Sequence, residues 1–583
     1  MRHRCTITLA PLTQVHPKAL GQRQGGERRR RDPIPSAARG RLMYAPVYRP
    51  HHSTEIQLTY LTHNIYKNLD EGRDVTAVYL DISKYFDKIW HDGLLHKCKH
   101  EFFISGTLLS WLKSYLTERQ QKVRIDDNFS LTKTINSGVP QGSVLGPLLA
   151  LMYLNGLTKE VTNDILLYAD DTSIHASHDK HDKDTVRRSL QKDLDTIDRY
   201  GRQWAITFNS SKTVQQTFTR KTQNCPLNLT FGRQPIPIVD SHKHLGLTFS
   251  KDLRFHTHVN TILRKMNMAI GPIYPIAKFL TRSILSGLYT TYIRPYHDYG
   301  DVVFDGHITT HDEIRLERLQ NRFARLTTGT PLKTPSDKLR HEVGWETLKT
   351  RRELHRLTLF KKIALFPEFQ PTYITSILPQ PRIETTNRNL RNAQARTLPP
   401  NKTASFQKSF IPNTIRKWNT ISTSITENTS MSIFKREIAE LLGCPSPSPY
   451  FSFGNKVGNR LHAQIRTGTI SLNAYLFQNQ KSASPACPCG YATENVPHFL
   501  LYCQIYRTLR ETFFDHISEL THKDFNILSS AIKLDLLIDG KSLNSEDGRR
   551  VAGCFQRHVI NSLALRSAAL SVGGGGGGAA APL

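Results

Sequence analysis

The alternation of apolar and polar residues along the chain predicts a mixed α/β fold. Apolar residues with helical spacing over 54–70 predict a helix with one broad apolar face. The run Ala77-Val78-Tyr79-Leu80 is short and apolar and ends at Asp81, which is typical of a buried strand. Residues 164–168 and 172–176 predict two strands around a tight turn, and residues 184–204 predict an amphipathic helix. The first half of the chain is therefore expected to contain an α+β domain.

Helices dominate the pattern further along the chain. Two helices, broken near Ser105-Gly106, are expected over 94–116, and a buried helix is expected over 144–157. The pattern from about 255 to 365 is mainly helical, whereas residues 366–460 are rich in Pro, Ser, Thr and Asn and show weaker periodicity. No internal repeat is apparent.

Charge points to a polyanionic partner. The 583 residues contain 78 Lys and Arg against 49 Asp and Glu, a formal net charge of +29, and nucleic acid is the commonest partner of such a chain. Eight cysteines in this length argue against a secreted scaffold built on disulfides. No apolar run approaches the ~20 residues of a membrane span, so no membrane partner is expected. Charge alone leaves open whether the protein binds nucleic acid or acts on it.

Three aspartates carry the clearest catalytic signal. Asp81 ends an apolar strand, and Asp170 and Asp171 lie at the turn of a predicted hairpin. Adjacent carboxylates between apolar strands are costly, and a hard divalent cation such as Mg²⁺ offsets that cost. A solvated turn remains the alternative for any isolated Asp-Asp pair. The Gly-rich segment 137–147, which leads into an apolar helix, would let the backbone approach a ligand closely.

Taken in order, these motifs resemble the palm of reverse transcriptases of non-LTR (LINE-type) retrotransposons. The residues that carry the resemblance are the first catalytic motif at 80–91, the substrate-grip motif at 137–147, Tyr168-Ala169-Asp170-Asp171, the Trp204 to Thr213 motif and the primer-grip segment at 242–247. The resemblance covers about 48–365. It implies an RNA-directed DNA polymerase that adds dNTPs to a primer 3′-hydroxyl on an RNA template, using two Mg²⁺ ions.

The resemblance also implies a role for individual residues. Asp81, Asp170 and Asp171 would bind Mg²⁺ together with the backbone carbonyl of Ile82. Phe86 would exclude a ribose 2′-hydroxyl, and Gln141 and Gly142 would line the dNTP and template pocket. Lys212 would act on the leaving pyrophosphate, with a plain surface lysine as the alternative.

A basic stripe predicts contact with a nucleic-acid backbone. Arg315, Arg318, Arg322 and Arg325 are spaced to share one helix face beside an apolar one, as in a thumb helix along the template–primer. A solvated helix is the alternative. Lys243 in the primer-grip segment is a further expected nucleic-acid contact.

A Cys/His cluster predicts a structural zinc site. Cys487, Cys489, His498 and Cys503 supply three thiolates and an imidazole, a suitable tetrahedral Zn²⁺ set. The segment resembles the zinc-knuckle-like region near the C-terminus of many such retroelement proteins. A structural clasp and a nucleic-acid contact are both open roles.

The expected organisation is a right-hand polymerase palm with a helical thumb, a helical region and a small zinc-binding module. Its segments are a disordered basic N-terminal segment (1–42), partial fingers and palm (43–240), primer grip and helical thumb (241–365), a connecting region (366–460), the zinc-knuckle-like module (461–510), and a helical tail ending in Gly/Ala low complexity (511–583).

The pattern departs from the family in three respects. Fingers motifs that normally precede Arg49 are missing, so an N-terminally truncated polymerase is expected, and no endonuclease fits upstream. Tyr85 replaces a small residue, and Gly156-Leu157 replaces Asp-Leu. The competing hypothesis is an inactive fragment that only binds nucleic acid. The family relationship implies a nuclear location, and the oligomeric state stays open.

Overall fold

A computed structural model describes residues 5–9 and 52–572, apart from 222–225, 383–394, 448–449, 452, 541–542 and 544. The chain forms two compact units, each assembled from three segments. The first unit comprises residues 1–257, 302–307 and 359–427, and the second comprises residues 258–301, 308–358 and 428–583.

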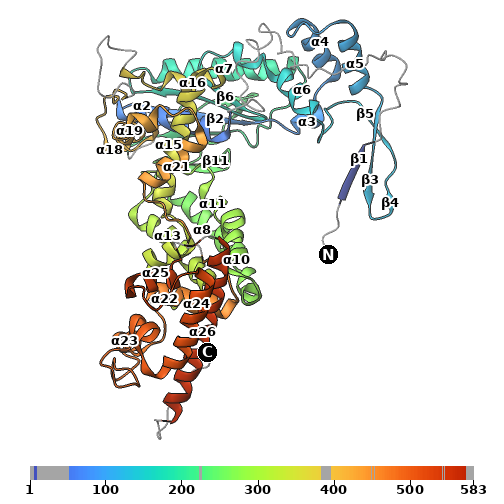
Figure 1. Ribbon diagram of the computed structural model, residues 1–583. Helices are drawn as coiled ribbons and strands as arrows, with labels where there is room; N and C mark the ends of the chain where they lie inside the picture. Colours follow the sequence, from blue (N-terminus) through green and yellow to red (C-terminus); the bar gives the residue numbers. More distant parts are fainter. Residues whose placement is uncertain are drawn as a thin grey trace. The chain divides into compact units, whose positions relative to one another are not determined.

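The first unit is organised around an antiparallel sheet with strand order β6-β7-β2-β8 (Figure 1). These strands are β6 (Asp164–Tyr168), β7 (Asp171–His178), β2 (Asp74–Asp81) and β8 (Val214–Phe218). Seven of the eight residues of β2 are buried, as expected for a central strand that is covered on both faces. The predicted strands at 77–81, 164–168 and 172–176 are confirmed, and β7 begins one residue earlier than expected, at Asp171.

Alternation along β2 assigns its two faces to different partners. Val78 and Leu80 belong to a core that they form with α6 (Leu145–Leu154) and α7 (Lys183–Gln203). Tyr79, on the other face, stacks on His242 with ring centroids 4.3 Å apart. His242 lies in the hairpin of β11 (Ser241–His244) and β12 (Leu247–Ser250), so the predicted primer-grip segment packs against the sheet.

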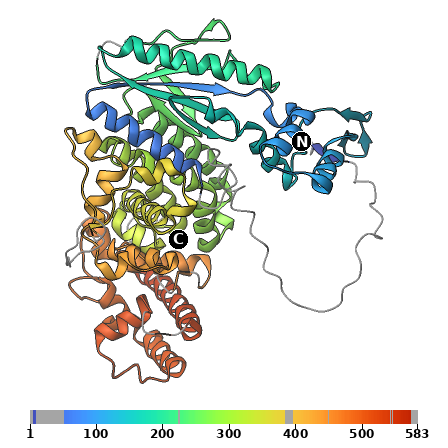
Figure 2. The same ribbon diagram turned by 90° about the horizontal axis from the view of Figure 1, so that it is seen from above.

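Helix α2 (Thr54–Asp70) confirms the first predicted helix and also packs on the sheet (Figures 1 and 2). It begins where the Ser53 side chain accepts a hydrogen bond from the Ile56 N–H, a standard helix cap. Short helices from the 366–460 segment pack against it, namely α16 (Thr372–Ser376), α18 (Ala404–Gln407) and α19 (Phe410–Trp418). These three helices have four to nine residues and are too short to produce clear periodicity, which explains the weak pattern over 372–418.

Tyr85, expected as a bulky ring beside the active strand, packs inward. The ring is buried and its hydroxyl donates a hydrogen bond to the Ala150 carbonyl of α6. The larger side chain therefore fills core volume between α3 (Tyr85–Lys88) and α6, and it satisfies its polar atom there.

A second sheet lies next to α4 (His91–His100) and α5 (Gly106–Leu116) in the sequence. Its strands are β1 (Cys5–Leu9), β3 (Arg119–Ile125), β4 (Asn128–Phe129) and β5 (Lys133–Ile135). β1 pairs antiparallel with β3, so the expectation of disorder is wrong for residues 5–9. The local sequence Thr6-Ile7-Thr8 is β-branched and favours a strand, whereas the expectation rested on the composition of the whole segment. The rest of 1–42 lies outside the described residues.

The second unit is helical. Its main helices are α8 (His256–Ile270), α10 (Arg282–Leu288), α13 (Thr310–Thr328), α14 (Ser336–Val343), α21 (Met431–Leu441), α22 (Lys456–Thr467), α24 (Arg507–Thr521), α25 (Ser530–Ile538) and α26 (Ser545–Val572). Residues of α22, α24, α25 and α26 share one core with the Cys/His segment, including Cys487 and Cys503. The expected zinc module and helical tail are therefore parts of a single packed structure, and the Gly/Ala tract at 573–583 lies outside the described residues.

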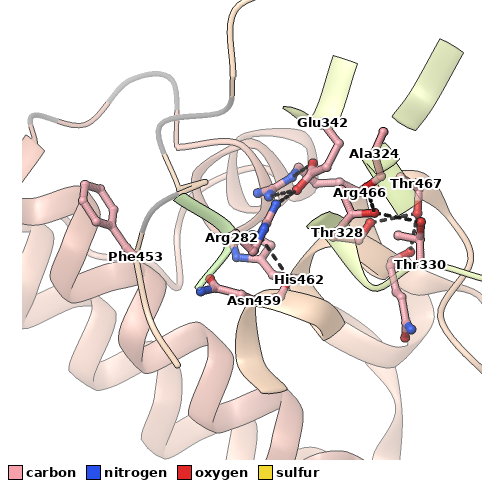
Figure 3. A network of polar contacts seen from close by, with 12 residues as sticks. Arg282, Ala324, Thr328, Thr330, Glu342, Phe453, Asn459, His462, Arg466 and Thr467 are labelled. Atoms are coloured by element: carbon pink, nitrogen blue, oxygen red, sulfur yellow. Dashed lines mark hydrogen bonds and ion pairs between the residues drawn. The ribbon is translucent and has the colours of Figure 1, made fainter. Parts of the chain in front are cut away.

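One carboxylate joins three helices of this unit. Glu342 of α14 accepts from Arg282 of α10 and from Arg466 of α22, with Arg466 Nε 2.6 Å from Glu342 Oε2 (Figure 3). The three side chains are 2–7 % exposed. Arg282 Nη1 also donates to the Asn459 carbonyl, 3.1 Å away, and Arg466 Nη1 donates to the Ile538 carbonyl, 2.9 Å away. Both guanidinium groups thus have a charge partner and a backbone partner.

Within the described part of the chain, no helix combines the length and the apolar character needed to span a membrane.

Glu342→Gln should destabilise the second unit severely, because it leaves two buried guanidinium groups without their counter-charge. The expected loss is about 3–5 kcal/mol in the free energy of unfolding, measured by urea denaturation. Glu511→Gln is the matched control, since Glu511 pairs with Arg507 at the surface and its loss should cost less than about 1 kcal/mol. Equal effects of the two substitutions would contradict the role given to Glu342.

Candidate active site

Strand pairing brings the predicted catalytic aspartates together. Asp81 at the end of β2 is the register partner of Asp171 at the start of β7. Tyr168 pairs with Asp171 in the next strand, so Ala169 and Asp170 form the two-residue turn between β6 and β7. Ala169 has φ of 57°, a left-handed conformation that costs a non-glycine residue about 1–2 kcal/mol. The turn thus places Asp170 next to the Asp81–Asp171 pair.

The three carboxylates repel one another. Partial burial of the Asp171 carboxyl, together with the negative charges of Asp170 and Asp81, raises the pKa of Asp171 from 3.8 to about 6. The residue as a whole remains exposed, so surrounding protein removes only part of the water from the carboxyl group. Uncompensated negative charge is the property expected of a cation-binding site.

Lys212 supplies a counter-charge to this centre. Its Nζ lies 3.3 Å from Asp81 Oδ2, and both side chains are accessible to solvent. The segment that carries Lys212 is tied to β2 by the backbone, because Asn209 N–H donates to the Asp81 carbonyl over 2.8 Å and Ser83 N–H donates to the Thr207 carbonyl over 2.9 Å. Neither bond uses the carbonyl of Ile82, the expected backbone ligand.

The Gly-rich segment 137–147 lies against α3. Gly138 N–H donates to the Ile89 carbonyl over 2.7 Å, and Val139 N–H donates to the Phe86 carbonyl over 2.8 Å. A Cβ on Gly138 would lie 2.7 Å from the carbonyl oxygens of Phe86 and Asp87, so only glycine permits this approach. These contacts hold the segment of Gln141 and Gly142, the expected pocket residues, against the segment of Phe86, which is expected to exclude a ribose 2′-hydroxyl.

Phe86 and Gln141 each have a defined environment. The Phe86 ring is partly buried and meets Tyr85 edge-on, with centroids 5.7 Å apart. Gln141 Nε2 donates to Asp87 Oδ1 over 2.7 Å. Gly142 has φ of 84° with open space at its Cβ position, and it lies one residue beyond Gln141. Asp87, which sequence reasoning did not single out, thus orients a predicted substrate residue.

The predicted arginine stripe lies on α13, but its members differ in environment. Arg318 and Arg322 are exposed, whereas Arg315 is bound to Asp312 over 2.9 Å and Arg325 donates to the Thr334 carbonyl over 3.2 Å. Arg322 donates to the Tyr274 hydroxyl over 2.6 Å. Three of the four arginines therefore bind residues of their own unit, and two of the four, Arg318 and Arg322, are also exposed. Lys243 is exposed on β11.

The Cys/His cluster converges. The ligand atoms of Cys487, Cys489, His498 and Cys503 all lie within 4.8 Å of one another. Tyr491 stacks on the His498 ring with centroids 4.3 Å apart. Glu494, which sequence reasoning missed, is fully buried beside Cys487 and is bound by Arg566 of α26 over 2.7 Å. A lone glutamate offers no sequence signal of such a distant partner.

A second convergent group, His297, Asp298 and Asp301, is an ion-pair network. Arg351 binds Asp298 through Nε and Nη2, both 2.8 Å from its oxygens, and His355 Nδ1 lies 2.7 Å from Asp301 Oδ2. Arg351 and His355 of α15 (Leu348–Leu365) thus already bind these carboxylates. Among the described residues, Asp81, Asp170 and Asp171 do not form such a group, because their carboxylate oxygens do not all lie within 4.8 Å of one another.

Comparison with known proteins gives a consistent result. Residues 42–249 match the family described as reverse transcriptase (RNA-dependent DNA polymerase). The chain is 29 % identical over 322 residues to the "Probable RNA-directed DNA polymerase from transposon BS" of Drosophila melanogaster, which covers 53 % of this chain and 35 % of that protein. It is 30 % identical over 294 residues to the "Probable RNA-directed DNA polymerase from transposon X-element" of the same species, covering 48 % and 31 %.

The chain therefore spans about a third of the length of the curated relatives that it matches. Among solved structures, a telomerase from Candida albicans in complex with a TWJ fragment of telomeric RNA matches with 12 % identity and a TM-score of 0.27. That match covers 58 % of this chain and 57 % of the telomerase chain.

Asp171→Asn should stabilise the first unit at neutral pH. The pKa of Asp171 is raised in the folded state, so the folded protein binds the proton more tightly than the unfolded chain does, and stability falls as pH rises from about 4 to about 6. In EDTA, the variant should have a higher urea midpoint than the wild type at pH 7, and the two should converge below pH 4. The exposed turn residue Asp127 serves as control, and Asp127→Asn should show no such pH-dependent gain.

Proposed function

We propose that this chain, whose residues 42–249 match the reverse transcriptase (RNA-dependent DNA polymerase) family, is an RNA-directed DNA polymerase of a non-LTR retrotransposon. Its reaction would join a deoxynucleotide to the 3′-hydroxyl of a primer paired with an RNA template. The observation that carries the proposal is the pairing of Asp81 with Asp171 beside the Asp170 turn. The polymerase motifs thus meet at one point of the fold.

The donor set of this centre fits Mg²⁺. Its ligands are hard oxygens, and burial together with the negative charges of Asp170 and Asp81 raises the pKa of Asp171, so a divalent cation would offset part of this cost. Asp81, Asp170 and Asp171, with the carbonyl of Ile82, would hold two Mg²⁺ ions. When bound, such ions activate the attacking hydroxyl and stabilise the leaving pyrophosphate.

The neighbouring residues would orient the nucleotide. Phe86 would exclude the 2′-hydroxyl of a ribonucleotide by contact, a role that suits a ring whose inner edge is packed against Tyr85. Gln141, oriented by Asp87, and Gly142 would line the pocket for the dNTP and the template base. Lys212 would donate a proton or a charge-assisted hydrogen bond to the pyrophosphate as it leaves, once a substrate competes for its contact with Asp81.

Exposed cations would contact the nucleic-acid backbone. Lys243 on β11 and Arg318 and Arg322 on α13 are accessible for phosphate contacts, and Arg315 and Arg325 would support the same ridge. RNA template, DNA primer and dNTPs are thus the proposed partners, and a nuclear location is proposed because retrotransposition ends on chromosomal DNA.

The Cys/His cluster is proposed as a structural Zn²⁺ site. Cys487, Cys503 and His498 are almost fully buried and Cys489 is half-buried, and three thiolates with one imidazole form a closed tetrahedral set. Because these residues share a core with α22, α24 and α26, the metal would stabilise the second unit as a whole.

Primer extension tests the polymerase proposal. The purified chain should incorporate dTTP on poly(rA)/oligo(dT) with Mg²⁺, and Asp170→Asn should reduce incorporation by at least about a thousandfold, since it removes a metal ligand. Asp184→Asn, on the exposed face of α7, is the matched control and should retain activity. Incorporation no higher than that of Asp170→Asn would end the proposal, and retained RNA binding in that case would favour a nucleic-acid-binding protein.

Metal analysis tests the zinc proposal. The purified protein should contain one Zn²⁺ by mass spectrometry of the metal, and Cys489→Ser should lose it together with thermal stability. Cys444→Ser, a half-buried cysteine outside the cluster, should keep full occupancy. Full zinc occupancy in Cys489→Ser would exclude this ligand set.

A further inference from the structure

A cavity of about 500 Å³ lies in the first unit at the end of the sheet remote from the aspartates. Its walls come from five regions: α2, the residues after β8, the residues after β12, the Gly306-His307 loop, and α18 with the residue after it. The cations that line it are Arg220, Lys221, Lys251, Arg254 and Lys408, and Asp252 is the one carboxylate among its lining residues. Such a cavity favours an anionic ligand.

Three of these cations have acidic partners. Lys221 Nζ lies 2.7 Å from Asp74, Lys251 Nζ lies 3.1 Å from Asp240, and Arg254 Nε lies 3.6 Å from Asp252. Arg220 donates to the Thr403 hydroxyl over 3.2 Å. Within the described part of the chain, neither Arg220 nor Lys408 forms an ion pair, and both are exposed. Their charges are therefore available to a ligand.

His307 is a buried imidazole in the wall of the cavity. Its ring stacks on Tyr66 with centroids 4.0 Å apart and planes at 9°, and its buried Nε2 has no hydrogen-bond partner. Burial, together with the positive charges of Lys408 and Arg220, lowers the pKa of His307 from 6.5 to about 3. The cavity wall thus contains an imidazole nitrogen without a hydrogen-bond partner, close to two cations that form no salt bridge among the described residues.

The cavity is separate from the polymerase centre. Lys221 is bound to Asp74, the first residue of β2, whereas Asp81 is the last residue of that strand. An eight-residue strand places these ends about 23 Å apart. In a duplex, that distance corresponds to about seven phosphates along one strand.

We propose that this cavity binds the phosphate backbone of a nucleic-acid strand, as a second contact for the RNA or DNA on which the aspartate centre acts. The choice of nucleic acid rests on the proposed function, because a polymerase centre in the same compact unit implies a polynucleotide ligand. Arg220 and Lys408 would make the new phosphate contacts, and the hydroxyls of Thr219 and Ser405 also line the cavity.

Binding of a fluorescein-labelled 20-nucleotide RNA, followed by anisotropy in EDTA at several NaCl concentrations, tests the proposal. The double variant R220Q/K408Q should bind about tenfold more weakly than the wild type in moderate salt, and its slope of log K against log [NaCl] should be shallower by about 1.4, or 0.7 for each lost single-strand contact. The control K180Q/K192Q removes two exposed charges elsewhere in the same unit. An equal loss in the control would overturn the proposal.

Two further variants separate charge from folding. R220K/K408R keeps both charges and should bind like the wild type, whereas weak binding by this variant would overturn the proposal by showing that packing is responsible. Lys408→Gln alone removes a side chain at the surface and should lose about half of the effect on the slope.

Competition with tripolyphosphate distinguishes a free polyphosphate from a strand. RNA should bind the cavity more tightly than tripolyphosphate does, and the difference between the wild type and R220Q/K408Q should be larger for RNA. A difference seen only with tripolyphosphate would overturn the assignment to nucleic acid. All binding is measured in EDTA, so a negative primer-extension result does not affect this binding test. A negative result in the binding test, in turn, does not contradict the polymerase proposal.

Discussion

The structure of the first unit depends on the register between β2 and β7. That register places Asp81 opposite Asp171 and leaves Asp170 in the adjoining turn, so three carboxylates meet at one end of the sheet. Burial of the Asp171 carboxyl and its repulsion by Asp170 and Asp81 oppose this arrangement, and both raise the pKa of Asp171. The buried core below, in which Val78 and Leu80 of β2 pack with α6 and α7, provides the free energy that keeps the strands in register.

Sequence reasoning identified the parts of this site that depend on local pattern. Apolar runs ending at Asp81 and Tyr168 located the strands, and the glycines of 137–147 indicated a close backbone approach, which Gly138 makes. The inward position of Tyr85 was not predictable, because the direction of one aromatic ring depends on the space left by α6. The disorder expected for residues 5–9 was wrong because segment composition concealed a short β-branched run.

Long-range polar contacts account for most of what the sequence did not reveal. Glu342 joins Arg282 and Arg466, and Glu494 joins Arg566, across separations of 60 to 124 residues. No spacing rule connects such residues, since their pairing follows from the packing of helices that approach only after folding. The cationic cavity was equally hidden in the sequence, because its walls come from five separate stretches of chain.

The interleaving of the two units has a consequence for the order in which they can fold during synthesis. Each unit draws on three stretches of chain, and the last stretch of the first unit runs to residue 427. The ribosome therefore releases two stretches of the second unit before the first unit is complete. During that time, the helices of these two stretches lack some of their final partners. Arg282 and Glu342, for example, are synthesised before Arg466, which completes their ion-pair network. Synthesis rate and chaperone access thus become determinants of the yield of folded protein.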